Sequence, residues 1–443
     1  MSPTPKVGYV GVDVLNNATV CNEATGLLAA GVPLEVASVY PHRSATYYHD
    51  ETLDRLRAAV RDIYPIRPAE LAGALLGGPF RFGMRFWKTL AAAAFGPAEG
   101  PKQRLTLLYQ FLPGLVLATR WRNAGIGHIH AHWAHTATSV AMHAAGLLGV
   151  GFSFTGHAND LFVHRVALLA KVRRARFIVC ISEYHRKLYL DMGAEPDRLK
   201  VVYCGIDTRR FAADAESRRL ASVGRPRVVS VGRLVEKKGF HDLIAACARL
   251  RDDGVDCECV IAGSGPERDR LRRLIDDHAL ADRVTVTGET VLQEDLPGLL
   301  RSSAVLALPC VRDRDGDMDG LPSVLTEAML CGVPVVSTRF VGIPDLVRDG
   351  ETGRLVEPGD VPALAEAVRS LLESPEESAR LGEAGRAWAL EHFDRDEAVR
   401  RLSRLFGWCA SHPGHDAPEP WFPSAPEAAR VRRPASAKAG AAV

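Results

Sequence analysis

The chain has 443 residues, of which 47% are hydrophobic and 24% are charged. These proportions are typical of soluble globular proteins, and they exclude a fibrous or mostly disordered chain. The 55 Lys and Arg residues are nearly balanced by 53 Asp and Glu residues, so the chain lacks the basic excess with which proteins neutralise nucleic-acid phosphates.

Short apolar runs alternate with longer helical patterns through the first half of the chain. Most of these runs are continuously apolar, which is typical of strands buried on both faces of a parallel sheet. A polar, charged stretch over Phe211–Arg225 then predicts a boundary, with a first domain over residues 1–212. The predicted strands of this half are Val7–Val12, Pro33–Val39, Gly127–His130, Gly151–Thr155, Phe177–Ile181 and Lys200–Cys204.

A long segment over residues 64–126 interrupts this alternation. Between Leu76 and Gly125 it holds seven Lys or Arg residues and one acid, Glu99, with aromatic residues interleaved. This composition suits contact with an anionic membrane surface. The alternative is a pair of helices whose aromatic side chains pack inward and whose charges are solvated.

The second half of the chain repeats the strand–helix alternation, which predicts a second doubly wound α/β domain over residues 213–376. Helices over residues 377–409 are expected to return toward the first domain, and residues 410–443 are expected to be disordered. The predicted strands are Arg227–Val231, Cys257–Ala262, Arg283–Thr287, Ala304–Leu308, Pro334–Ser337 and Gly353–Val356. The predicted helices include Gly239–Asp253, Glu267–His278 and Val361–Leu372.

The amino-terminal segment leads directly into a strand-like sequence, without the charged and apolar regions of a signal peptide. No apolar stretch reaches the roughly 18 residues that span a bilayer. Nine cysteines are scattered without a Cys-x-x-Cys pair, which is the pattern of reduced, buried thiols. We therefore expect a cytoplasmic protein that could contact a membrane from that side.

The first motif with chemical content is Val231-Gly-Arg-Leu-Val-Glu-Lys-Lys-Gly239, at the end of a predicted strand. Arg233 and Lys238 lie in a loop that leads into a helix, and the free N–H groups of that helix add to the positive charge. Two cations at this spacing suit a diphosphate. The alternative is a solvated basic loop.

The second motif places two carboxylates eight positions apart, in a predicted loop and in the helix that follows it. Asp319 precedes the helix and Glu327 lies within it. A carboxylate accepts two hydrogen bonds, so such residues can hold the paired hydroxyls of a sugar. The amides of Gly320 and Leu321 would face the group that Asp319 orients. Alternatively, both acids are simply solvated.

These two motifs, with Glu327-Ala-Met-Leu-Cys-Gly-Val-Pro-Val-Val336, together resemble the family-4 retaining glycosyltransferases. His128–His135 and Phe152–Asp160 resemble the subgroup that assembles exopolysaccharides such as colanic acid and lipid-linked oligosaccharides. The resemblance implies a GT-B fold, in which two Rossmann-like domains face each other across a cleft. It also implies transfer of a sugar from a nucleotide-sugar donor to a saccharide acceptor, expected to be lipid-linked.

The resemblance further assigns roles to single residues. It implies that Arg233 and Lys238 bind the diphosphate and stabilise the departing nucleotide, and that Glu327 binds the ribose. Asp319 would contact the donor sugar, although the family usually has Glu there and the shorter side chain could alter donor choice. From the first domain, His157 would reach the reacting sugar and Asp160 would contact the acceptor.

No metal and no other cofactor is expected. Fixed cations can stabilise a leaving diphosphate without a metal, and the acidic segment Asp313–Gly320 lacks the closing carboxylate of a calcium loop. His128, His130 and His132 share one face of a predicted strand but lack further ligands at zinc spacing, and we expect them to line the acceptor side. Glu23 falls where the subgroup often has an acid, and the sequence assigns it no role.

Two alternatives remain open. The same fold could carry a sugar-nucleotide epimerase or a phosphorylase, or a non-catalytic subunit that has lost its chemistry. No nucleic-acid partner is expected, and an anionic inner-membrane surface is a possible partner of the basic, aromatic segment.

Overall fold

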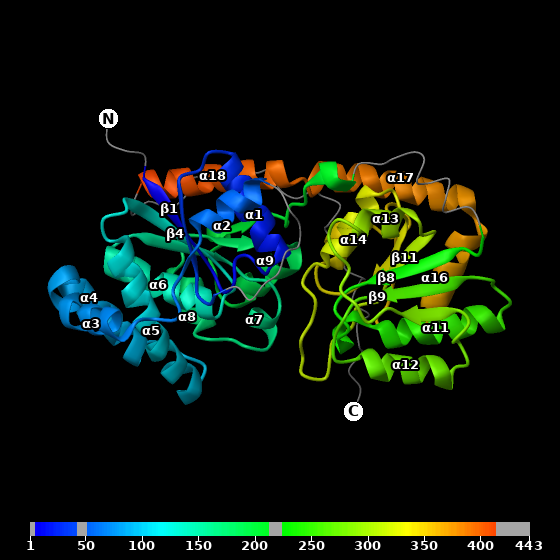
Figure 1. The fold of residues 1–443 in the computed structure, drawn as a ribbon, viewed down its shortest axis with the longest axis horizontal. Helices are drawn as coiled ribbons and strands as arrows, with labels where there is room; N and C mark the ends of the chain where they lie inside the picture. Colours follow the sequence, from blue (N-terminus) through cyan, green and yellow to red (C-terminus); the bar gives the residue numbers. More distant parts are fainter. Residues whose placement is uncertain (1–4, 42–50, 212–223, 413–443) are drawn as a thin grey trace, which may run out of the picture.

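The computed structural model describes residues 5–41, 51–211 and 224–412. Within these ranges the chain forms two parallel β-sheets, each flanked by helices, in two units that lie side by side (Figure 1). The strand orders are β3-β2-β1-β4-β5-β6-β7 and β10-β9-β8-β11-β12-β13. Both orders reverse direction beside the first strand of the unit, as in Rossmann-like folds. The predicted class of two doubly wound α/β domains is confirmed.

Apart from the edge strand β3, the strands of the first sheet are buried and mainly apolar, which explains why the sequence indicated them. They are β1 (Lys6–Gly11), β2 (Leu34–Ser38), β3 (Arg61–Asp62), β4 (Ile126–His132), β5 (Gly151–Thr155), β6 (Ile178–Cys180) and β7 (Leu199–Val201). The two-residue edge strand β3, which pairs with β2, was not predicted because it is polar and too short to show a pattern. The covering helices are α1 (Ala18–Ala29), α2 (Glu51–Ala59), α6 (Thr136–Leu148), α7 (Asn159–Phe162), α8 (Leu168–Arg174) and α9 (Glu183–Asp191).

The interrupting segment forms three further helices, α3 (Pro68–Phe82), α4 (Met84–Phe95) and α5 (Pro101–Trp121). Helix α5 packs closely on α6, where a Cβ at Gly114 would lie 2.7 Å from Cβ of His143. Helices α3 and α4 project at the end of the molecule that is far from the second domain (Figure 1). Some aromatic side chains of this segment pack inward and others face solvent. Phe86 and Phe111 are buried, whereas Phe80 and Phe95 are exposed.

The second domain is built in the same way around its six-stranded sheet. Its strands are β8 (Arg227–Val231), β9 (Glu258–Ala262), β10 (Val284–Val286), β11 (Val305–Leu308), β12 (Val335–Thr338) and β13 (Arg354–Val356). Its helices are α11 (Phe240–Asp252), α12 (Arg268–Asp277), α13 (Leu296–Arg301), α14 (Ser323–Leu330), α15 (Ile343–Leu346) and α16 (Val361–Glu373). Loops that leave the carboxyl ends of parallel strands gather at one edge of the sheet, and this geometry positions the site.

Two last helices run along both domains. Helix α17 (Pro375–His392) lies on the second domain, and α18 (Arg395–Ser411) continues over the first (Figure 1). Phe406 of α18 is fully buried in the same apolar cluster as Val7 and Tyr9 of β1. The chain passes from the first domain to the second after Ile206 and returns at Asp394. These two residues form a β-bridge, so the two crossing segments lie side by side.

The predicted boundary after residue 212 falls at the edge of 212–223, outside the described residues. The same holds for most of the tail that we expected to be disordered, since the description ends at residue 412. Residues 410 and 411, which we had assigned to that tail, belong to α18.

Candidate active site

A tight loop at the carboxyl end of β8 carries Arg233 and Lys238. Gly239, with φ of +68°, leads from this loop into α11. A Cβ at Gly239 would lie 1.8 Å from the carbonyl oxygen of Pro309, so a side chain cannot be accommodated there. The glycine thereby lets the basic loop press against the segment after β11, which carries the acidic residues of the site.

Two adjacent lysines of the loop hold this acidic segment. Nζ of Lys238 lies 2.5 Å from Oδ2 of Asp319, and Nζ of Lys237 lies 3.2 Å from Oδ1 of the same carboxylate. Lys237 also pairs with Oδ2 of Asp317 at 2.8 Å. All four side chains are largely buried. A single carboxylate therefore bridges two ammonium groups.

The pKa values follow from this pairing. Burial opposes the charge of Asp319, but the ammonium groups of Lys238 and Lys237 hold the pKa of the carboxyl below its ordinary value. Burial likewise opposes the charge of Lys238, but Asp319 holds the pKa of that ammonium above its ordinary value. Both groups are thus charged at neutral pH.

Glu327 lies in the middle of α14 and is buried. Burial raises the pKa of its carboxyl to about 7, against the opposing charges of Arg210 and Lys238. Among the described residues, none donates a hydrogen bond to this carboxylate. A buried carboxylate of this kind gains from a ligand that brings hydroxyl donors.

Arg233 is exposed beside these groups. Its positive charge opposes the rise in the pKa of Lys238. The four charged residues that the sequence assigned to the donor are therefore brought together. Arg233 and Lys238 come from the loop after β8, Asp319 from the loop after β11, and Glu327 from α14. Leu321 is half-buried and packs on the core of the second domain.

The first domain touches this cluster through the loop that follows β5. A Cβ at Gly320 would lie 2.5 Å from the carbonyl oxygen of His157, so the two loops meet without a side chain between them. Next to this contact, the backbone N–H of Glu183 at the start of α9 donates to Oδ2 of Asp345 across the domains, at 2.5 Å. The predicted residues His157 and Gly320 therefore belong to one site.

The His157 ring is held by a chain of hydrogen bonds that leads into the first domain. Its Nε2 lies 3.1 Å from Nδ1 of His132, and Nε2 of His132 lies 2.9 Å from Oε1 of Glu23. The hydroxyl of Tyr9 donates to the same carboxylate oxygen at 3.1 Å. The indole of Trp133 packs on the His157 ring, with 4.6 Å between the centroids.

Asp160 lies inside the first domain rather than at its surface. It is fully buried, and its carboxylate accepts hydrogen bonds from the backbone N–H groups of Ala134, His157 and Ala158, at 2.5, 3.1 and 2.9 Å. These contacts give Asp160 a structural role, and the acceptor contact predicted for it stays a prediction. It ties the loop after β4 to the loop after β5 and so fixes the backbone of His157.

His128 and His130 also differ from expectation. Both are fully buried and hydrogen-bond to Ser153 on β5, at 2.8 Å in each case. The rings pack against Phe406 of α18, because that helix covers the strand face we expected to be open. Only His132 of the three joins the site.

One group of potential metal ligands occurs in the described part of the chain, formed by Glu23, His130 and His132. Their ligand atoms already bond to one another or to hydroxyls. His132 binds Glu23, and the two ring nitrogens of His130 bind Ser153 and Thr155. The expectation that no metal takes part stays a prediction.

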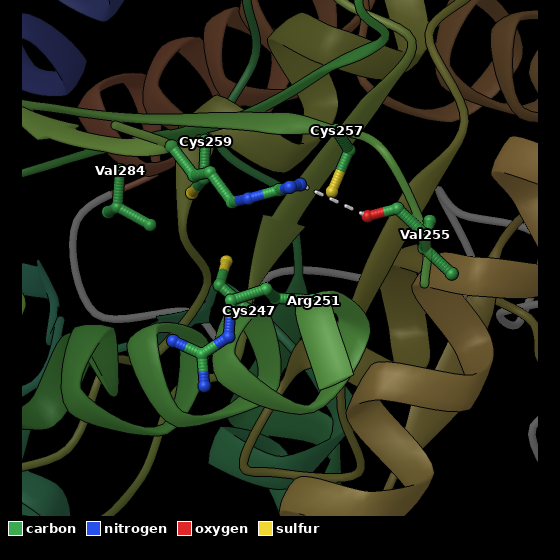
Figure 2. Close-up of a pocket in the computed structure, with 7 residues that line it drawn as sticks. Cys247, Arg251, Val255, Cys257, Cys259 and Val284 are labelled. Atoms are coloured by element: carbon green, nitrogen blue, oxygen red, sulfur yellow. Dashed lines mark hydrogen bonds between the residues drawn. The ribbon is translucent and has the colours of Figure 1, made fainter. Parts of the chain in front are cut away.

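A gap lined by thiols lies elsewhere in the second domain, at the amino ends of β9 and β10. Figure 2 shows Cys247 of α11 facing Cys257 and Cys259, with Arg251 beside them. The gap has no room for a water molecule, and burial raises the pKa of Cys257 to about 11. Neutral thiols in a dry gap act as packing groups.

Comparison with known proteins identifies the family to which this arrangement belongs. The sequence matches the family described as "Glycosyl transferases group 1" over residues 213–388 and "Glycosyltransferase Family 4" over residues 90–210. It is 34% identical to a GDP-mannose-dependent alpha-(1-6)-phosphatidylinositol monomannoside mannosyltransferase of Mycolicibacterium smegmatis, over 66% of this chain and 81% of that protein. The chain belongs to the family-4 glycosyltransferases.

Other relatives and structures agree with this assignment. WcaL of Escherichia coli, a putative colanic acid biosynthesis glycosyltransferase, is 30% identical over 73% of this glycosyltransferase and 76% of its own length. HepE of Anabaena, solved with UDP, superposes with a TM-score of 0.67 at 18% identity, covering 91% and 100% of the two chains. Sucrose-phosphate synthase of Thermosynechococcus elongatus gives 0.70 at 17% identity, covering 92% and 99%. The structures establish the shared GT-B fold.

Several residues of the site in this glycosyltransferase were not found from the sequence. Lys237 was passed over in favour of its neighbour, although a buried lysine beside acids needs a partner. His132 was expected only to line the acceptor side, Glu23 was left without a role, and Asp345 was not considered. Since Glu23 and His132 are 109 positions apart, no local pattern in a single sequence could have paired them.

Proposed function

We propose that this glycosyltransferase is a metal-independent, retaining enzyme that moves a sugar from a nucleotide-sugar donor to a saccharide acceptor in the synthesis of exopolysaccharide or another cell-surface glycan. The observation that carries the proposal is the convergence of Arg233, Lys238, Asp319 and Glu327 beside the His157 loop. The named roles of the relatives in mannosyl transfer and colanic acid biosynthesis support it.

The charges suggest how the donor is held. The diphosphate takes Lys238 as a partner in place of, or together with, Asp319, and the exposed Arg233 contributes a second cation. Glu327 accepts hydrogen bonds from the ribose hydroxyls, which satisfy its buried carboxylate. Asp319 then faces the donor sugar, with the amides of Gly320 and Leu321 beside it, and His157 approaches that sugar from the first domain.

The reaction follows from these contacts. The bond between the anomeric carbon and the diphosphate oxygen breaks, and the acceptor hydroxyl attacks from the same face. The acceptor proton moves to the departing diphosphate oxygen, which balances the step without a protein base. Arg233 and Lys238 stabilise the charge that grows on the diphosphate, so configuration is retained and no metal is needed.

An assay with UDP-, GDP- and ADP-sugars tests this function, because HepE was solved with UDP whereas the mycobacterial relative is named for GDP-mannose. We expect transfer to a saccharide acceptor with the anomeric configuration unchanged by NMR, and equal rates with and without EDTA. Conversion of the donor in the absence of acceptor would instead indicate an epimerase. Donor binding by calorimetry without turnover on any acceptor would indicate a non-catalytic subunit.

We further propose that the α3–α5 segment docks the enzyme on the cytoplasmic face of an anionic inner membrane, where a lipid-linked acceptor is reached. Phe80 and Phe95 are 90% and 85% exposed, among the cations Arg81, Lys88 and Lys102. Between the three helices lies an apolar groove of about 340 Å³, lined by leucines with three aromatic residues. Exposed aromatic groups among cations suit an anionic interface. None of the described helices is long and apolar enough to cross a bilayer.

Pelleting with lipid vesicles tests the docking surface. Substitution of both Phe80 and Phe95 by serine is expected to weaken binding to anionic vesicles at least about tenfold, because two aromatic side chains no longer leave water. Leu292→Ser, at a 46% exposed position of the second domain, serves as the control and should bind normally. Equal binding to neutral vesicles, or indifference to salt, would contradict the proposal.

A further inference from the structure

Hydrogen bonds link Tyr9, Glu23, His132 and His157 in a chain. Which atom donates in each of these bonds is set at the buried end, by Tyr9 and Glu23. Burial and the neighbouring Glu23 raise the pKa of Tyr9 well above its ordinary value, so the Tyr9 hydroxyl keeps its proton and donates to Oε1 of Glu23. A carboxylate can only accept. The ring nitrogen of His132 that faces this oxygen, Nε2, must therefore carry a hydrogen.

The next link follows from the number of protons on each ring. We take the His132 ring with a single hydrogen, which then lies on Nε2, and the lone pair of Nδ1 lies 3.1 Å from Nε2 of His157. Burial, together with the neighbouring histidines, holds the pKa of His157 well below its ordinary value, so that ring carries a single N–H at neutral pH. Two lone pairs cannot face each other, so the hydrogen of His157 lies on Nε2.

The other nitrogen of His157 is left as an acceptor. Among the described residues, none hydrogen-bonds to its Nδ1. The rest of the residue is fixed, since the backbone N–H donates to Asp160, the carbonyl accepts from Nε2 of His185 at 2.8 Å, and Trp133 packs on the ring. The backbone carbonyl of His157 touches Gly320, next to Asp319, so the residue that carries this acceptor lies beside the acidic loop.

We infer that Glu23 and His132 are positioning residues that hold His157 with its hydrogen on Nε2, so that Nδ1 accepts a hydrogen bond from a hydroxyl of the donor sugar. The identity of that hydroxyl rests on the proposed function, whereas the tautomer does not. A carboxylate that orients a histidine through a second histidine keeps its own charge away from the sugar.

The tautomer is measured by long-range ¹H–¹⁵N NMR on the ligand-free full chain with ¹⁵N-labelled histidine, using His157→Asn to assign the signals. We expect the Nε2–H form in the unmodified protein. In Glu23→Ala the acceptor that sets the direction is gone, and His157 should show a mixture of both tautomers. An Nδ1–H form in the unmodified protein, or an unchanged spectrum in Glu23→Ala, would overturn the inference.

Kinetics supply a second readout. Glu23→Ala is expected to lower kcat/KM for the nucleotide sugar about tenfold, the order expected from one hydrogen bond. Binding of the nucleoside diphosphate, which lacks the sugar, should change less than about twofold. Glu23→Gln keeps an oxygen acceptor and should restore most of the activity. Glu35→Ala removes a carboxylate that pairs with Lys6 at 2.6 Å in the same domain and is the matched control.

Two results separate this inference from the proposed function. Equal losses of nucleoside diphosphate binding and of turnover in Glu23→Ala would mean that Glu23 has only a structural role, and this would overturn the inference. If no sugar is transferred from any donor while the tautomers behave as expected, the proposed function fails and the positioning of His157 stands.

Discussion

Lys238→Ala is expected to lower turnover by at least about 100-fold, because an ammonium that stabilises a growing negative charge at a leaving group contributes on that scale. The fold should survive the change, since Asp319 keeps Lys237 as a partner at 3.2 Å. The affinity for the nucleotide sugar should fall less than the turnover does, because the charge on the diphosphate is largest in the transition state. Steady-state transfer rates at saturating donor concentration measure the effect.

Two comparisons make this prediction specific. Arg314→Ala removes a cation that is 77% exposed and pairs with Glu236, and turnover should stay within about twofold because surface ion pairs contribute little. Lys238→Arg keeps the charge but not the compact ammonium and should lie between these extremes. Near-normal turnover in Lys238→Ala would refute the assignment of the diphosphate to this loop.

Asp160→Ala is expected to lower the free energy of unfolding of the first domain by about 3 kcal/mol, because two buried backbone N–H groups and one partly buried one lose their acceptor at once. The two loops that the carboxylate joins would also loosen, so transfer activity should fall. Urea unfolding followed by tryptophan fluorescence measures the stability, since Trp133 lies in the affected loop.

The control for this variant is Asp54→Ala, at a carboxylate that is 74% exposed and pairs with Arg57 within one helix. Such a pair contributes a few tenths of a kcal/mol, so stability should hardly change. If Asp160→Ala unfolds like the unmodified protein but fails to bind a saccharide acceptor, the original expectation of an acceptor contact would be restored and the structural role rejected.

The positions of the donor-site residues were predictable because local sequence and topology act together. Continuous apolar runs reveal parallel strands, and the carboxyl ends of such strands lie at one edge of the sheet. Arg233 and Lys238 follow β8, and Asp319 follows β11. Because these two strands are parallel and adjacent in the sheet, the three side chains must lie close together. Asp345, by contrast, acts across the domains on α9, and nothing near it in sequence indicates that contact.

The histidines of β4 show where this reasoning stops. Alternation along the strand correctly puts His128, His130 and His132 on one face, but it does not tell what covers that face. Helix α18 brings Phe406 onto the first two rings from the far end of the chain. Only His132 lies beyond the cover, close enough to His157 to join the site.

The sequence by itself determined the two-domain α/β fold and the cationic and acidic loops of the donor site, because these depend on hydrophobic periodicity and on residues near one another along the chain. Only the tertiary structure decided that Asp160 faces inward and that Glu23 and His132 support His157. Those roles depend on which buried polar groups find partners, and some partners come from other strands and helices, in the case of Glu23 and His132 from 109 positions away.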